Sequence, residues 1–311
     1  MMDMDGLLPL VLPAVMAGAA RPLSGLLPPR TATWLLTAAG VALALASTAT
    51  LAVLALGGAL RLPLIAKLGH LSEHVLHHAA ETSPALATVA GLALVASLVA
   101  VGHAATTHIR ALLDGARTAR GLPGKGMLAV VEDDAADAFA LPGRPGRIVV
   151  STGMLAALDS AERDVLLAHE HAHLAGRHHL FRTAAHIAAT ANPLLWPLRG
   201  AVTYTTERWA DESAAGTDRA RAARAIGKAA LARNGRPGLS HPSALGIGSF
   251  FTRRRARPGP LPRRVAALLA PPPRRRGLLV AATVVLVVLS VLSANDGAID
   301  LHQLIEHAQA G

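Results

Sequence analysis

Three runs of this chain contain no Asp, Glu, Lys or Arg and are long enough to cross a lipid bilayer: residues 31–60, 82–101 and 277–293. A spanning helix needs about 20 apolar residues. A weaker run at 6–20 contains two prolines and follows acidic rather than basic residues, unlike a signal peptide. We interpret it as a fourth span or a membrane-embedded segment. The sequence therefore predicts a mainly α-helical, polytopic membrane protein.

The charge distribution predicts the orientation of these spans. The whole chain has a formal net charge of +10, but residues 110–276 alone hold 26 Lys+Arg against 13 Asp+Glu, a net +13. Basic segments stay on the cytoplasmic side of a membrane. Arg21 and Arg30 precede the 31–60 span, two crossings away from 110–276, and so lie on the same side. We expect 110–276 to be cytoplasmic, and the 61–81 loop and the 295–311 tail to lie outside.

These boundaries divide the chain into a membrane region at 1–109, with spans at about 6–20, 31–60 and 82–103, and a cytoplasmic domain at 110–252. A basic linker at 253–276, a last transmembrane helix at 277–294 and a short outer tail at 295–311 follow. Within the domain, the patterns predict strands at 127–131, 138–141 and 147–151, a helix from Asp159, and helices at about 202–215 and 218–233. The linker, rich in Arg and Pro, is expected to attract anionic lipid. Aromatic residues make up only 3% of the chain, and we expect no direct nucleic-acid binding.

The residues most informative about chemistry are His169, Glu170 and His173, an H-E-x-x-H motif in the helix predicted from Asp159. Residues i and i+4 share a helical face, so both histidines can present ring nitrogens to one Zn²⁺. Glu170 then projects beside the metal, where it can act as a general base. The chain contains no cysteine, so any such site must use His and carboxylate ligands. One zinc ion per chain is expected.

A catalytic zinc site needs a third protein ligand, and the sequence offers two candidates. His179 completes a literal H-E-x-x-H-x-x-G-x-x-H pattern, but that metzincin pattern also requires a methionine turn downstream, and every Met of this chain precedes the motif. Glu207 lies on the next predicted helix, four residues before Asp211. Glu207 can ligate zinc while Asp211 accepts the N–H of a ligating histidine. The sequence therefore favours Glu207 over His179.

These motifs together resemble the membrane-bound gluzincin peptidases of the HtpX and CAAX-prenyl-protease type, which are related to the BlaR/MecR-type antirepressor peptidases. The resemblance rests on residues 138–143, 148–155, 167–174 and 177–178, and on Glu207 with Asp211. It implies a zincin-like α+β metallopeptidase domain facing the cytosol, with zinc held by His169, His173 and Glu207. It also implies that an edge strand near 138–141 or 147–151 pairs with extended substrate. The chain lacks the Ser-x-x-Lys motif of a penicillin-sensing domain.

Residues 183–198 form a further uncharged run, between the His ligands and Glu207. A single crossing there would put Glu207 on the opposite side of the membrane from His169. The run is too short to cross twice, and Asn192-Pro193 and Pro197 would interrupt a helix. We therefore expect a domain helix that is buried or touches the bilayer surface.

Histidines also gather in the predicted outer loop, as His70, His74, His77 and His78. Such a helical face could bind Zn²⁺ or Cu²⁺, but the loop is too small to form a catalytic cleft. In the cytoplasmic domain, His171, His178 and His179 are interpreted as packing or surface residues.

The sequence favours a membrane-embedded zinc metalloendopeptidase that hydrolyses peptide bonds of cytosolic or membrane proteins. Its role could be signal-regulated cleavage of a cytosolic winged-helix repressor, or quality control of membrane proteins. The alternative is a non-catalytic metal sensor or scaffold with a structural zinc site. Glu170 argues against that alternative, because a structural site has no use for a base beside its ligands.

Overall fold

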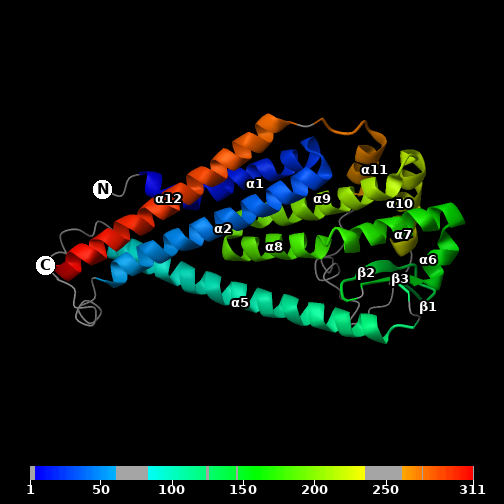
Figure 1. The fold of residues 1–311 in the computed structure, drawn as a ribbon, viewed down its shortest axis with the longest axis horizontal. Coiled ribbons are helices and arrows are strands. Elements are labelled where there is room, and N and C mark those ends of the chain that lie inside the picture. The colour runs from blue at the N-terminus through cyan, green and yellow to red at the C-terminus, as the bar shows by residue number, and fades with distance from the viewer. Residues whose placement is uncertain are drawn as a thin grey trace.

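The computed structural model describes residues 4–60, 83–123, 126–144, 146–234, 261–274 and 276–310. These residues form an elongated and mostly helical molecule (Figure 1). Long helices form a bundle along most of its length, and a small sheet with shorter helices occupies one end.

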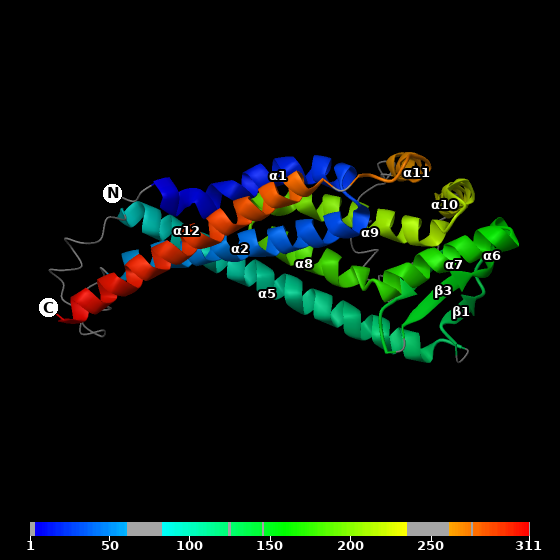
Figure 2. The same cartoon turned by 45° about the horizontal axis from the view of Figure 1, so that its top comes forward.

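Four of the described helices are long and apolar enough to cross a membrane. They are α1 (Leu8–Leu26), α2 (Pro29–Ala59), α5 (Pro84–Gly121) and α12 (Gly277–Ala310). They match the four predicted apolar segments, including the weaker one at 6–20. Large apolar side chains of α5 and α12, such as Leu92, Val99 and Leu278, are well exposed, as expected where lipid rather than water covers a helix. In two views α12 lies along α1 and α2 (Figures 1 and 2).

Helices α5 and α12 both continue past their predicted spans. The end of α5 reaches the sheet, where Ala119 packs with Leu141 and Val149. The segment that we expected to form a separate tail after residue 294 is helical and continuous with α12. A polar stretch can extend a helix that hydrophobic burial has already nucleated, because each added residue contributes a hydrogen bond.

The sheet contains β1 (Leu128–Val131), β2 (Ala138–Leu141) and β3 (Arg147–Ser151), in the order β1-β3-β2. All three predicted strands are confirmed. β2 and β3 form an antiparallel pair, and β1 runs parallel to β3. Because β3 is paired on both sides, it has no free edge, and of the two strands suggested for substrate pairing only β2 is an outer strand.

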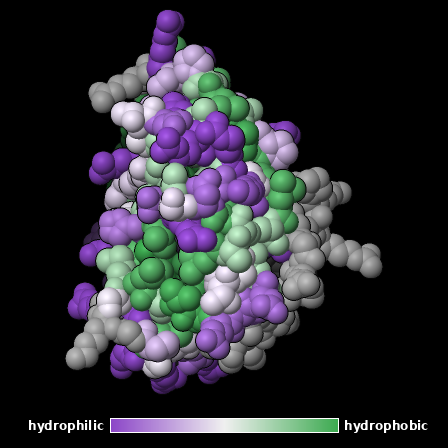
Figure 3. All heavy atoms as spheres, turned by 90° about the vertical axis from the view of Figure 1, so that its right-hand side faces the viewer, coloured by the Kyte–Doolittle hydropathy of each residue, from purple (hydrophilic) through white to green (hydrophobic). Residues whose placement is uncertain are grey.

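Within the described residues, six α-helices belong to the end of the molecule that contains the sheet or connect it to the bundle. They are α6 (Thr152–Ala157), α7 (Ser160–Ala175), α8 (His178–Ala191), α9 (Trp196–Ala215), α10 (Arg219–Asn234) and α11 (Leu261–Leu269). Helix α7 begins as predicted, because Asp159 and Glu162 form a reciprocal capping box. Seen from this end, the surface shows many hydrophilic residues around an apolar area (Figure 3).

The uncharged segment 183–198 folds into a helical hairpin. Helix α8 ends before Asn192, a short 3₁₀ turn (η2, Pro193–Leu195) reverses the chain, and α9 returns toward the sheet. The Asn192 amide donates to Ser47 Oγ of α2 at 2.9 Å, and Ser97 Oγ of α5 donates to the Ala191 carbonyl at 3.0 Å. The predicted interruption thus occurs at Asn192-Pro193. Pro197 instead lies in the first turn of α9, where a missing N–H is tolerated.

Part of the predicted basic linker has a different structure from the one expected. Residues 261–269 form α11, which packs on α9 and α10 rather than serving only as a connection near lipid. Leu268 of α11 is buried in an apolar cluster that also contains Val165 of α7 and Ala222 of α10. This packing places Arg264 beside Glu207 and Asp211 of α9, an outcome that its Arg- and Pro-rich surroundings did not indicate.

Candidate active site

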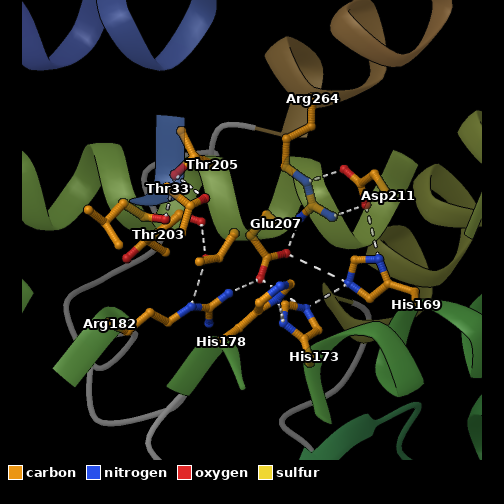
Figure 4. A network of polar contacts seen from close by, with 12 residues as sticks. Thr33, His169, His173, His178, Arg182, Thr203, Thr205, Glu207, Asp211 and Arg264 are labelled. Carbon is orange, nitrogen blue, oxygen red and sulfur yellow. Dashed lines mark hydrogen bonds and ion pairs between the residues drawn. The ribbon is translucent and has the colours of Figure 1, made fainter. Parts of the chain in front are cut away.

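The candidate site lies between α7 and α9, which pack against each other. Helix α7 contributes His169 and His173, and α9 contributes Glu207 and Asp211 (Figure 4). Glu170 also belongs to α7. The i and i+4 spacing on each helix puts its two functional side chains on the facing surface. Both His169 and Glu170 are buried, so the site is shielded from bulk water.

Ligand atoms of His169, His173 and Glu207 converge within 4.8 Å of one another. The two Nε2 atoms are 3.1 Å apart, and oxygens of Glu207 lie 3.5 Å from Nε2 of His173 and 3.9 Å from Nε2 of His169. Ligands at zinc–ligand distances of about 2.0–2.1 Å in a tetrahedron stand about 3.4 Å apart. The observed separations bracket that value, so this donor set fits a zinc ion.

The other nitrogen of each histidine has its own partner. Nδ1 of His169 lies 3.0 Å from Oδ1 of Asp211. Nδ1 of His173 lies 2.8 Å from Nδ1 of His178, the first residue of α8. If both Nδ1 atoms are protonated, the two Nε2 lone pairs and the Glu207 carboxylate converge as three acceptors. Three acceptors that converge in this way form a binding site for a cation.

Two arginines neutralise the buried carboxylates. Arg182 of α8 contacts one oxygen of Glu207 at 2.5 Å, and Arg264 of α11 contacts the other at 2.5 Å. Arg264 also donates two hydrogen bonds to Asp211, at 2.8 Å and 2.6 Å. The sequence prediction of Asp211 as a partner of a ligating histidine matches this geometry, but it did not include either arginine.

Burial and charge shift the pKa values of these groups in different directions. Burial raises the pKa of Glu170, which favours a proton-accepting role. Burial would also raise the pKa of Glu207, but Arg264 and Arg182 outweigh it and hold that pKa well below its usual value. Burial lowers the pKa of His173 well below 6.5 and that of His178 to about 4, so both rings are neutral at pH 7. For His169, the nearby Asp211 and Glu207 overcome burial, and the pKa is raised.

The remaining predicted histidines do not join this cluster. The third-ligand alternative, His179, is half-buried beside His178 and is not part of the converging group, and His171 is exposed. The candidate outer metal site at His70, His74, His77 and His78 lies outside the described residues.

The sequence patterns did not point to Arg182 or Arg264 as site residues. His178, interpreted as a packing or surface residue, is buried and packs on Trp209, and it also contacts His173 directly, which was not expected. Its distance of five residues from His173 crosses the end of a helix, so helical periodicity does not place it. Gly176, which directly follows the end of α7, is the local sequence feature that indicates a turn between His173 and His178.

Comparison with known proteins is consistent with this geometry. Residues 103–234 match the model of Peptidase family M48. No curated protein and no solved structure matches the chain significantly. The matched segment contains His169, Glu170, His173, Glu207 and Asp211, whereas Arg264 lies beyond it. Over this region the chain is therefore similar to the M48 peptidases, which supports a membrane-associated metallopeptidase of that family.

Proposed function

We propose that this protein is a membrane-embedded zinc metalloendopeptidase with His169, His173 and Glu207 as ligands and Glu170 as general base. The observation that carries the proposal is the convergence of three ligand atoms with a buried carboxyl group adjacent in sequence to the first. When bound, zinc acts as a Lewis acid that polarises the scissile carbonyl and makes water a stronger acid.

The residues of the chain supply the remaining steps. Glu170 accepts the proton of the attacking water on its carboxylate and passes it to the departing amine nitrogen. Its raised pKa makes it a stronger base than an exposed glutamate. Asp211 holds His169 in one orientation through Nδ1. We propose that β2, an outer strand of the described sheet, aligns an extended peptide by main-chain hydrogen bonds. Arg233 of α10 donates to the Ala138 carbonyl of this strand at 2.6 Å, so a bound peptide would have to displace that contact.

The central test compares Glu170→Gln with the parent in detergent, using an unfolded substrate such as casein. We expect Glu170→Gln to keep zinc but to cleave at least about 100-fold more slowly, because general-base catalysis contributes that much or more. His173→Ala should lose both zinc and cleavage. Equal cleavage by Glu170→Gln and the parent would contradict the mechanism, and stoichiometric zinc without any cleavage by the parent would favour the structural-site alternative.

The third ligand is tested by zinc content. Glu207→Ala should lower bound zinc far more than His179→Ala, because only Glu207 converges with the two histidines. The reverse ranking would support the metzincin-like ligand set.

We further propose that the physiological substrate is a cytosolic winged-helix repressor, cleaved when a signal reaches the membrane region. Support comes from connectivity: α5 runs from a candidate span directly to the sheet, and α11, which holds Arg264, is followed closely by α12. Proteomics of a strain carrying Glu170→Gln should show one small DNA-binding protein accumulating. Broad accumulation of unrelated membrane proteins would instead support quality control.

A further inference from the structure

We propose that His178 is a positioning residue that fixes the tautomer and ring orientation of His173, as Asp211 does for His169. This inference rests on the proposed zinc site. His178 is not itself one of the proposed zinc ligands. In this proposal, His178 is the Nδ1 partner of His173, whereas Asp211 is the Nδ1 partner of His169.

His178 lies within hydrogen-bond distance of the ring nitrogen of His173 that the proposed zinc site leaves free. Its Nδ1 lies 2.8 Å from Nδ1 of His173, and the two rings are nearly perpendicular, at 89° with centroids 4.8 Å apart. Only 1% of His178 is exposed, so water cannot readily replace this contact. In Figure 4, both rings lie beside the Glu207 carboxylate.

The tautomers follow from the metal chemistry. A histidine that binds zinc through Nε2 has its proton on Nδ1. Nδ1 of His173 is therefore the donor, and Nδ1 of His178 must be the acceptor, which leaves the His178 proton on Nε2. Without an acceptor at this place, His173 would lose the interaction that selects the Nδ1–H tautomer and fixes the ring plane.

The turn between α7 and α8 is shaped to deliver this ring. A Cβ atom on Gly176 would lie 2.4 Å from Nε2 of His178, so only glycine allows the approach. Arg177 then adopts a left-handed conformation, with φ of 48°, which is strained for a residue that has a Cβ atom. On its other side, the His178 ring packs on Trp209 of α9, with centroids 4.7 Å apart. Backbone and packing thus both hold His178 against His173.

The decisive experiment measures zinc affinity of the full chain in detergent by competition with a chelator, for His178→Asn, His178→Gln and His178→Leu. Asn places its oxygen close to the position of the His178 Nδ1, whereas Gln places its oxygen near Nε2, and Leu has no acceptor. Loss of a partner to a ligating histidine costs about 10- to 100-fold in metal affinity. We expect that loss for Gln and Leu, and affinity within about threefold of the parent for Asn.

The adjacent His179→Leu is the matched control and should bind zinc like the parent. The absorption spectrum of the Co²⁺-substituted chain should also change in the Gln variant and be preserved in the Asn variant, which a role in packing alone would not produce. If the Leu variant fails to fold, the comparison of Asn with Gln decides alone. Equal affinities for these two variants would overturn the proposal, whereas a parent chain that binds no zinc would refute the proposed function instead.

Discussion

At the residue scale, one arginine contacts both carboxylates that α9 contributes to the candidate site. This arginine lies outside residues 103–234, the segment that matches the M48 family. Arg264 bridges Glu207 and Asp211, and the Asp211 side chain is only 2% exposed. Buried ion pairs add little net stability over apolar packing, but removing one partner leaves an uncompensated buried charge. The main contribution of Arg264 to stability is therefore that it compensates the buried charge of Asp211, which its removal would leave uncompensated.

Replacing Arg264 with Met should destabilise the zinc-free chain by about 3 kcal/mol, because among the described residues Asp211 then keeps only His169 as a partner. Zinc should reduce this loss, since the ion supplies positive charge beside Glu207. Thermal unfolding of the parent and the variant, each with and without zinc, measures both effects.

The matched control is Arg221→Met, which removes an exposed i, i+3 pair with Asp218. Such pairs contribute about 0–1 kcal/mol. A loss for Arg264→Met no larger than that of this control would show that the bridge has no role in stability.

At the element scale, helix α7 is stabilised at its N-terminus. The H-E-x-x-H motif lies toward the opposite end of the same helix. Glu162 accepts from the backbone N–H of Asp159, and Lys228 of α10 donates to its carboxylate at 2.6 Å. The hydrogen bond from Lys228 is the main reason that the pKa of Glu162 is lowered from 4.5. One carboxyl group thereby links the capping box to a neighbouring helix.

This arrangement predicts a pH-dependent stability difference between the parent and Glu162→Gln. A carboxyl group whose pKa is lower in the folded chain stabilises the fold above about pH 4.5, and this contribution disappears as the pH falls through the lowered pKa. Glu162→Gln should therefore be less stable than the parent at pH 7 and equal to it in acid. Urea unfolding at several pH values measures the difference.

Asp164→Asn, an exposed position on the same helix, is the control and should behave like the parent throughout. A stability difference for Glu162→Gln that persists unchanged in acid would mean that the Lys228 pair is not its source.

At the scale of the whole molecule, the sheet with α6 and the C-terminal end of α12 lie at opposite ends of the long axis (Figure 1). Helix α7, which carries the H-E-x-x-H motif, belongs to the end with the sheet. The apolar part of the bundle separates the two ends. We expect a membrane around that part to place the two ends on opposite sides, with the basic, site-bearing end in the cytoplasm.

Single cysteines at two exposed positions test this arrangement, because the native chain contains none. A membrane-impermeant thiol reagent applied to intact cells should label His302→Cys at the far end of α12 and leave Asp164→Cys on α7 unlabelled. Lysis should make both accessible. Labelling of Asp164→Cys in intact cells would reverse the proposed orientation.

Much of this architecture follows from local sequence patterns. Long uncharged runs predicted the four apolar helices, because a run of about 20 apolar residues is long enough to cross a bilayer as a helix. Alternation and turn residues located the three strands. The spacing of His169 with His173, and of Glu207 with Asp211, predicted two facing pairs, because a helix places i and i+4 side by side.

Only the tertiary structure decided which residues complete the site. His178 reaches His173 across a break in helical periodicity, through a left-handed turn that no residue spacing specifies. Arg264 meets Asp211 across 53 residues of chain, because α11 packs on α9 and α10. Local patterns determine elements and the faces they present. Contacts between distant elements depend on how those faces pack together. The contacts that His178 and Arg264 make at the proposed zinc site are of this kind.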